Sequence, residues 1–171
     1  MRENKKSFRI YKWENEIEVV NKNYELLFTK GNITIKKEKY KIEIEPVGTL
    51  KNIKINENQD EIIYENYLEK IDLIYHIEDD GIKEEIKIKE KQEKLEYEFK
   101  INLENLEIEK EKNEIRYVDK KTKQEIFKMD RMFMYDMEYK KSKEIKMDYE
   151  NNILKIIPDK KWLEATFRKY P

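Results

Sequence analysis

YENYLEKIDLIYHIEDDGIKEEIKIK, residues 64 to 89, is the stretch on which the fold prediction depends. Apolar and charged residues alternate on both sides of Asp80-Gly81. Successive side chains of a strand point to opposite faces, so this alternation predicts one buried face and one hydrated face. An Asp-Gly pair between such runs favours a type I′ turn, because that turn needs positive φ at both central residues. The stretch therefore predicts a β-hairpin.

The same two-residue period recurs along the chain, most clearly from Leu95 to Leu103. A helix would scatter these apolar side chains around its axis, whereas a strand places them on one side. Lys and Glu are poor strand formers, but cross-strand pairs on the hydrated face offset part of that cost. The pattern predicts strands near residues 7–11, 15–20, 24–29, 32–36, 39–45, 49–55, 61–64, 72–78, 82–89, 95–101, 105–109, 114–118, 124–129, 131–135, 143–149 and 152–157.

One helical turn is predicted near the C-terminus, with Asp159 as its N-cap and Trp162 as its core anchor, followed by Leu163. Together these elements predict an all-β, mainly antiparallel protein, a sandwich or a curled meander of short strands, in one domain over residues 1–171. Sixteen predicted strands are many for one small sandwich, so some neighbours are expected to merge or to be loops.

Charged residues make up 44% of the chain, yet 37 Lys and Arg balance 38 Asp and Glu to a net charge of -1. A nucleic-acid groove needs concentrated positive potential, so no nucleic-acid partner is expected. The chain has no Cys, which excludes disulfides, thiolate zinc sites and cysteine nucleophiles. No signal peptide and no apolar run long enough to span a membrane is recognisable. Oligomeric state is left open.

No catalytic residue, metal site or cofactor is predicted. His76 is the only histidine, so it is expected to be structural or exposed. Glu78-Asp79-Asp80-Gly81 resembles part of a calcium loop but lacks the alternating oxygen ligands, and a turn is expected instead. With so many carboxylates, a glycosidase pair cannot be recognised from spacing. The three glycines lie too far apart for a phosphate-binding loop.

Several residues have a structural and a functional interpretation. Asp72 is expected to accept hydrogen bonds from backbone N–H groups and fix a turn, and Tyr75 to bond to a neighbouring strand. Trp13 and exposed tyrosines form a possible sugar-binding face. The methionines near Phe127 and Phe133 are expected to fill the core; they are Met129, Met132, Met134 and Met137.

An ordered set of short motifs runs from about residue 60 to the C-terminus. It comprises Tyr64 and Tyr67, Asp72 with Tyr75, Asp80-Gly81, Lys83-Glu84, Phe127 and Met129, Met134-Tyr135-Asp136, Pro158-Asp159 with Trp162-Leu163, and Tyr170-Pro171. Their order and spacing resemble a β-rich module of large bacterial wall-associated, DNRLRE-type and Rhs/YD-repeat proteins. The resemblance covers about residues 60–171. It implies structural roles for Tyr64, Asp72, Tyr75, Gly81, Lys83, Glu84, Asp136, Pro158, Trp162 and Leu163.

The resemblance implies a non-catalytic structural or interaction module, detached or truncated from a larger surface protein. Its partner would be a neighbouring domain, or a cell-envelope protein or glycan. The family context suggests the cell surface or secretion, although this chain carries no export signal. Two alternatives stay open: a carbohydrate-binding β-sandwich using Trp13, and a hydrolase whose unidentified carboxylates face each other about 5–10 Å apart across a cleft.

Overall fold

The computed structural model describes residues 7–48, 54–58, 60–93, 96–112, 114–129, 132–165 and 169–171. The fold is all-β and antiparallel, with one short C-terminal helix, as the alternation predicted. The largest sheet has eight strands in the order β1-β2-β3-β4-β5-β10-β17-β16. Its strands are β1 (Phe8–Lys12), β2 (Glu16–Asn21), β3 (Glu25–Thr29), β4 (Ile33–Lys37), β5 (Tyr40–Pro46), β10 (Tyr97–Glu104), β17 (Ile153–Pro158) and β16 (Ile145–Glu150).

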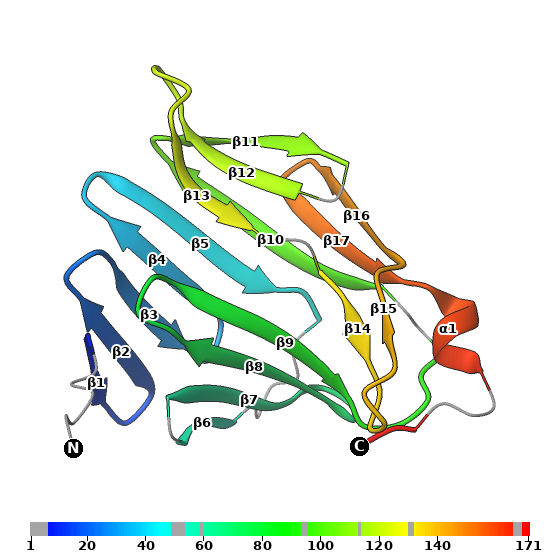
Figure 1. The fold of residues 1–171 in the computed structure, drawn as a ribbon. Coiled ribbons are helices and arrows are strands. Elements are labelled where there is room, and N and C mark those ends of the chain that lie inside the picture. Colours follow the sequence, from blue (N-terminus) through cyan, green and yellow to red (C-terminus); the bar gives the residue numbers. More distant parts are fainter. Residues whose placement is uncertain are drawn as a thin grey trace, which may run out of the picture.

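Three smaller sheets accompany the eight-stranded sheet, and Figure 1 shows the two larger ones over one of its faces. The four-stranded sheet contains β6 (Lys54–Asn58), β7 (Glu61–Leu68), β8 (Ile71–Ile77) and β9 (Ile82–Ile88). The three-stranded sheet contains β11 (Leu106–Glu111), β12 (Glu114–Asp119) and β13 (Glu125–Met129). A short hairpin pairs β14 (Met134–Tyr135) with β15 (Lys141–Ser142). The architecture thus combines a meander, β1 to β5, with a sandwich.

The core lies between these layers. In β10, Tyr97, Phe99 and Ile101 are buried while Lys100 and Asn102 are exposed, so the two-residue period separates core from solvent. Buried side chains of the eight-, four- and three-stranded sheets form one hydrophobic cluster. Burial of large Ile, Leu, Phe and Tyr side chains compensates for the low hydrophobic share of 38%.

The predicted strands are found with modest shifts, and the expectation that neighbours would merge is wrong. The strand predicted at 61–64 extends to Leu68, because a register shift between Tyr64 and Leu68 accommodates residues that break the alternation. The strand predicted at 131–135 is reduced to Met134–Tyr135, residue 131 lying outside the described residues. Residues 49–53 of another predicted strand also lie outside them. The pattern did not predict β15.

The type I′ turn predicted at Asp80-Gly81 is wrong, although the β8–β9 hairpin forms. Neither residue has positive φ, and the loop has four residues closed by Glu78 N donating to the Gly81 carbonyl at 2.9 Å. Two positive φ angles in a two-residue loop occur instead at Asn151 and Asn152, with φ of 50° and 63°, between β16 and β17.

Strand β8 does not have the predicted hydrated face. Asp72 and Ile74, whose side chains alternate with the core residues Leu73 and Tyr75, are also buried. β8 is a central strand, and long polar side chains of its neighbours cover the outer face; the Lys89 ammonium, for example, lies 2.7 Å from Asp72 Oδ1.

The C-terminal helix α1 (Lys160–Glu164) begins as predicted, because the Asp159 carboxylate accepts a hydrogen bond from Trp162 N at 2.9 Å. Its core anchor is Leu163, which is 6% exposed, and not Trp162, which is half-buried. Pro158 ends β17 opposite Ile145 and stops the strand directly before this helix. The described helix is far too short to cross a membrane.

Candidate functional site

Glu84 is a carboxylate on the apolar face of β9. Ile82, Ile86 and Ile88 share this face and pack against the core, while Lys83 and Glu85 point to the other side. Glu84 is solvent-accessible, yet protein surrounds it closely enough that desolvation raises its pKa to about 7. A half-ionised carboxylate near neutral pH, facing inward from an edge strand, is the most unusual electrostatic feature of the described residues.

Three buried tyrosines lie close to Glu84, and a fourth lies close to one of these three. Tyr75 is directly opposite it in the β8–β9 pair, and Tyr67 on β7 and Tyr117 on β12 are close enough for its charge to raise the pKa of each phenol. The fourth is Tyr97 on β10, which lies close enough to Tyr67 to contribute to the raised pKa of that phenol. Burial is the main cause of the raised pKa of all four phenols. The cluster therefore draws on three sheets.

Three of these hydroxyls are buried without a hydrogen bond of ordinary length and angle to any described residue: those of Tyr67, Tyr75 and Tyr97. The hydrogen bond predicted from Tyr75 to a neighbouring strand corresponds to one contact, with Glu84 on β9. The Tyr75 hydroxyl approaches the Glu84 carboxylate, and that contact lowers the Glu84 pKa in part. By contrast, the Tyr64 hydroxyl donates to the Thr29 carbonyl at 2.6 Å.

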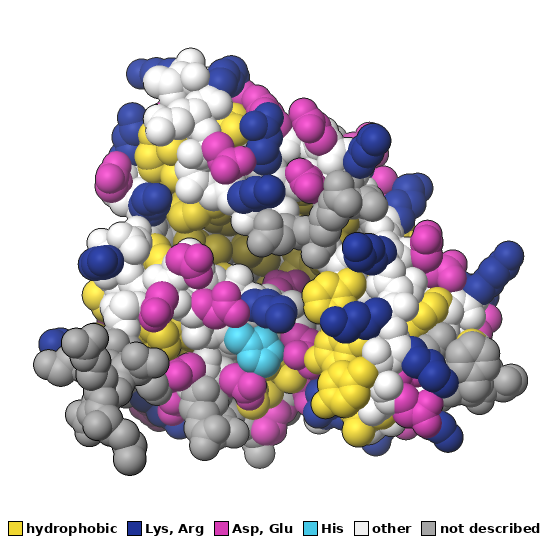
Figure 2. Space-filling model, in the orientation of Figure 1, with side chains coloured by type: hydrophobic (Ala, Val, Ile, Leu, Met, Phe, Trp, Pro, Cys, Tyr) yellow, Lys and Arg dark blue, Asp and Glu magenta, His cyan; other side chains and the backbone are white. Residues whose placement is uncertain are grey.

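A hollow opens on the side of the molecule where the four-stranded and three-stranded sheets face each other. Figure 2 shows that its floor is hydrophobic and that charged side chains rim it. In Figure 1 the same region lies between β9 and β13, over β5 and β10. Glu84 lies on β9, the edge strand that borders this region, and its side chain shares the inward face with Ile82 and Ile86.

An exposed aromatic patch lies beside the hollow on the β14–β15 hairpin and the residue before it. We define it as Phe133, Tyr135, Met137 and Tyr139, which are 41%, 44%, 58% and 78% exposed. The Tyr135 and Tyr139 rings are stacked, with centroids 6.3 Å apart and an interplanar angle of 5°. The prediction that the methionines fill the core is therefore wrong for Met137, whereas Met129 and Met132 do pack against the core.

Two lysines contact the Phe133 ring of this patch, Lys83 from the neighbouring sheet and Lys141 from the hairpin itself. The Lys83 ammonium lies 5.9 Å from the Phe133 ring centroid, and that of Lys141 lies 5.1 Å from it. The Glu85 carboxylate contributes to raising the pKa of Tyr135, after burial. Asp136 holds the hairpin turn, because its Oδ1 accepts hydrogen bonds from Glu138 N and Lys140 N at 2.9 and 3.0 Å.

Trp13 lies at the other end of the eight-stranded sheet, beyond β1. It is 60% exposed, and Tyr11 on β1 is 42% exposed. In Figure 1, β1 and the β14–β15 hairpin lie at opposite sides of the fold, so Trp13 does not join the aromatic patch. A sugar-binding face that combined Trp13 with many exposed tyrosines is not assembled; Tyr11 is its described aromatic neighbour in sequence.

His76 lies on the outer face of β8 between two carboxylates. Its Nδ1 is 3.2 Å from Glu61 Oε1, and its Nε2 is 3.1 Å from Glu85 Oε2. Cross-strand register explains this arrangement, because Glu61 pairs with His76 across the β7–β8 ladder. The contacts bridge three strands and give His76 a structural role in the sheet.

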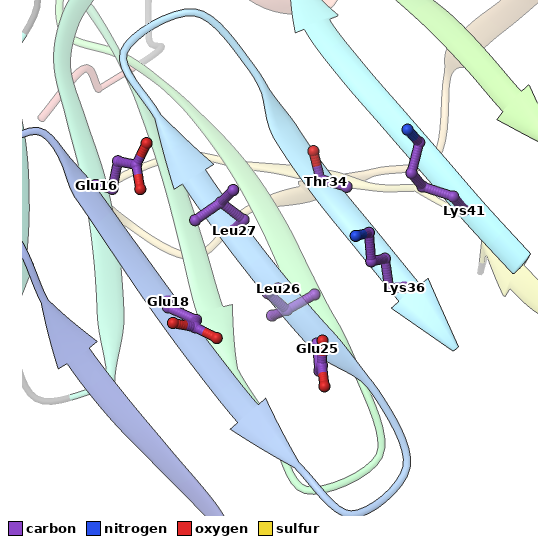
Figure 3. A pocket seen from close by; sticks show the side chains of 8 residues that line it. All are labelled: Glu16, Glu18, Glu25, Leu26, Leu27, Thr34, Lys36 and Lys41. Carbon is purple, nitrogen blue, oxygen red and sulfur yellow. The ribbon is translucent and has the colours of Figure 1, made fainter. Parts of the chain in front are cut away.

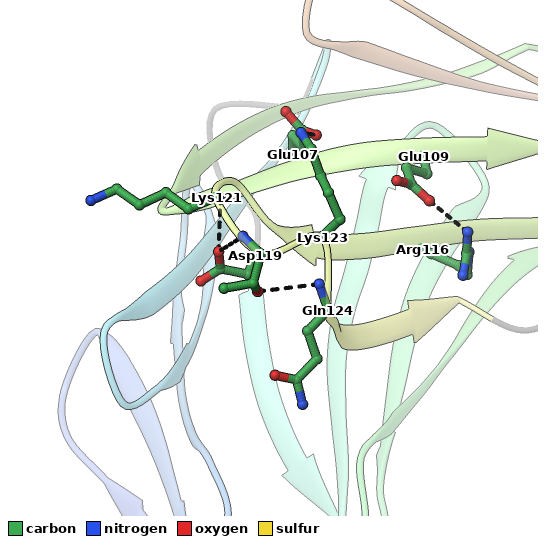
Figure 4. A network of polar contacts seen from close by, with 8 residues as sticks. Glu107, Glu109, Arg116, Asp119, Lys121, Lys123 and Gln124 are labelled. Atoms are coloured by element: carbon green, nitrogen blue, oxygen red, sulfur yellow. Dashed lines mark hydrogen bonds and ion pairs between the residues drawn. The ribbon is translucent and has the colours of Figure 1, made fainter.

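Asp72 and Asp119 are buried carboxylates that fix turns. Asp72 Oδ1 accepts a hydrogen bond from Asn66 N at 2.8 Å, which holds the irregular part of β7. Asp119 accepts from the Tyr40 hydroxyl at 2.6 Å and from Lys121 N and Thr122 N. The Tyr40 bond, followed by the backbone bonds, lowers the Asp119 pKa well below its usual range. Figure 4 shows this turn beside the Arg116–Glu109 pair, whose N···O distance is 2.5 Å.

The loop that resembled a calcium site, Glu78 to Gly81, is held by side chains from the N-terminal strands. Ser7 Oγ donates to Asp79 Oδ1 at 2.5 Å, and Asn21 Nδ2 donates to the Asp79 carbonyl at 2.8 Å. The Tyr24 hydroxyl donates to the Glu78 carbonyl and lies 3.1 Å from that of Gly81. The loop therefore connects the two layers of the sandwich, and three of its four carbonyls accept hydrogen bonds from protein donors.

A shallow trough of about 380 Å³ lies on the outer face of the eight-stranded sheet. Figure 3 shows Glu16, Glu18 and Glu25 on one side of it and Lys36 and Lys41 on the other. This separation of opposite charges stabilises a hydrated sheet face through cross-strand attraction. Glu84, the carboxylate whose pKa burial raises to about 7, is not among the residues that line this trough.

Within the described ranges, no group of three or more His, Cys, Asp or Glu side chains is arranged to hold a metal ion. The residues of the predicted motifs are thus spread over the sheets. The fold brings Tyr64, Tyr75 and Glu84 together, with Tyr67 close to Glu84. The sequence analysis did not identify Glu84 as an inward-facing carboxylate, although the series Ile82-x-Glu84-x-Ile86 indicates a carboxylate on an apolar face. In comparisons with known proteins, no family model, curated protein or solved structure matches this chain.

Proposed function

We propose that this chain is a non-catalytic interaction module whose binding surface is the aromatic patch together with the adjoining hollow. The observation that carries the proposal is the exposure of four large apolar side chains on one short hairpin, from Phe133 to Tyr139. Clustered exposed aromatic residues beside a concavity are typical of binding surfaces, because their burial by a partner releases water at little conformational cost. The role agrees with the resemblance to the scaffold module of wall-associated and Rhs-type proteins.

Charge also supports this assignment. The patch is flanked by Lys83 and Lys141, whose ammonium groups lie over the Phe133 ring. Their positions provide a polar rim around an apolar centre, the arrangement found at protein–protein interfaces. We propose that the partner is a neighbouring domain or an envelope protein that presents apolar side chains within an acidic surrounding.

Site-specific photocrosslinking tests this proposal. A photoreactive amino acid replaces Tyr139 in the patch or, as the control, Glu45 on the opposite face of the fold, in β5. After irradiation in living cells of the source organism, we expect a discrete adduct from position 139 and none from position 45. Loss of that adduct in the Tyr135→Ser variant would assign it to the patch. Equal labelling at both positions, or none at position 139, would contradict the proposal.

A carbohydrate partner is the second candidate, and the parallel Tyr135 and Tyr139 rings favour it. Exposed aromatic rings can pack against the apolar faces of sugars. A glycan array distinguishes the candidates: binding that is lost in Tyr139→Ala would indicate a glycan, whereas Trp13→Ala, on the far side of the fold, is the matched control. Binding lost only in Trp13→Ala would place the glycan at Trp13, away from the patch.

A further inference from the structure

Two open sheet edges face each other across the hollow. β9 is the last strand of the four-stranded sheet, and β13 is the last strand of the three-stranded sheet. The outer backbone N–H and C=O groups of each strand are thus left without a ladder partner in the described part of the chain. Such edges are templates for pairing with a further strand.

The direction of the two edge strands allows one strand to join them. Figure 1 shows that β9 and β13 run the same way, over the middle of the eight-stranded sheet. A single strand between them would be antiparallel to both, as in every other pair of this fold. The second layer would then contain four, one and three strands opposite the eight of the first layer.

The side chains that border the hollow are apolar and only partly buried. On β9 these are Ile82 and Ile86, and on β13 they are Phe127 and Met129, all of which pack against the core without being covered. A guest strand of about five residues, the length of β13, would bury these side chains.

Glu84 specifies the chemistry of the guest. It faces inward between Ile82 and Ile86, and no described lysine or arginine forms an ion pair with it. Covering this carboxylate with an apolar strand would be unfavourable, whereas a strand with a cationic side chain at this point would compensate for the lost hydration.

Deepening the proposed interaction function, on which it rests, we infer that the hollow accepts an extended peptide from a partner protein. The peptide pairs with β9 on one side and β13 on the other. Its inward side chains are apolar except for one lysine or arginine opposite Glu84. This is β-strand addition, in which backbone hydrogen bonds supply affinity and alternate side chains supply specificity.

A second copy of this chain is a poor guest. Each described strand is already hydrogen-bonded to at least one neighbour in its own sheet. An edge strand such as β1 or β16 has only one free side, whereas a guest between β9 and β13 needs both. A strand of another copy would have to leave its own sheet, so we assign the site to a segment of a different protein.

A phage-displayed library of random peptides of about nine residues tests the inference on the full chain. After selection on the wild-type protein, we expect enriched sequences to alternate apolar and polar residues, with Lys or Arg at one inward position. Hydrogen exchange with a synthetic copy of an enriched peptide should protect backbone amides of both β9 and β13. Replacing that basic residue by Glu should weaken binding at least tenfold.

Two variants connect the result to Glu84. In Glu84→Gln the preference for Lys or Arg should disappear, whereas Glu85→Gln, on the outer face of the same strand, should keep it. No enrichment, or protection outside β9 and β13, would overturn the inference. So would dimerisation of Glu84→Gln in light scattering, because Glu84 would then be an inward charge that prevents edge pairing. The crosslinking at position 139 does not depend on these outcomes, so the two proposals can fail separately.

Discussion

Removal of a hydroxyl from a buried tyrosine should stabilise this protein at one position and destabilise it at another on the same strand. Tyr67 is 1% exposed, and its hydroxyl has no hydrogen-bond partner among the described residues. An unsatisfied buried hydroxyl costs about 1–3 kcal/mol, and Tyr67→Phe removes that cost while keeping the ring. We therefore expect the free energy of unfolding to rise by about 1 kcal/mol.

Tyr64, three residues earlier in β7, is the matched control. It is 2% exposed, and its hydroxyl donates to the Thr29 carbonyl at 2.6 Å. Tyr64→Phe loses this bond and leaves the carbonyl with one donor fewer, so the free energy of unfolding should fall by about 1 kcal/mol. The two variants remove the same atom from equally buried rings, and only the hydrogen bonding differs.

Urea unfolding followed by circular dichroism measures both changes, and thermal unfolding checks them. For a domain of this size, 1 kcal/mol corresponds to a shift of about 2–4 °C in Tm. Tm should thus rise for Tyr67→Phe and fall for Tyr64→Phe. Equal losses in the two variants would refute the reasoning, because they would mean that the Tyr67 hydroxyl has a partner of its own.

Four other variants test the electrostatics and the backbone. Burial raises the Glu84 pKa from 4.5 to about 7. The free energy of unfolding of the wild type should therefore be highest below pH 4.5 and should fall as the pH rises through 7. The shift corresponds to about 3 kcal/mol, which solvent screening of the exposed side chain reduces to roughly 1 kcal/mol. Glu84→Gln should remove this fall between pH 5 and 8 in urea unfolding, and the same slope in both proteins would contradict it. The hydrogen bond from the Tyr40 hydroxyl lowers the pKa of Asp119 in the folded state. This bond therefore stabilises the protein at pH values above the unfolded-state pKa of Asp119, and the stabilisation is lost as the pH falls through the folded-state pKa. Tyr40→Phe should therefore move the acid-unfolding midpoint, followed by circular dichroism, to higher pH, and an unchanged midpoint would argue against this coupling. Lys70 has φ of 60°, so Lys70→Gly should stabilise by about 0.5 kcal/mol, whereas Lys87→Gly within β9 should destabilise by about 1 kcal/mol in the same urea assay.

The two-residue rhythm of the chain determined most of its secondary structure. Alternation in β10 placed Tyr97, Phe99 and Ile101 in the core, and the same rule placed Glu84 between two inward isoleucines. Side-chain direction in a strand is a local property, so it can be derived from neighbouring residues. The N-cap role of Asp159 is equally local, since it depends on a backbone group three residues away.

Tertiary contacts decided what local rules could not. The Asp80-Gly81 loop is bound by Ser7 and Tyr24, more than 50 residues away in sequence, and it does not form the turn that its sequence favours. Phe133 is 41% exposed although its apolar side chain alone would favour burial. β5 pairs directly with β10, although the four-stranded sheet lies between them in the sequence, and this pairing leaves β9 and β13 as facing edges. Bringing distant segments together costs conformational entropy, and the packing of whole sheets offsets that cost. No single stretch of sequence therefore determines this hollow.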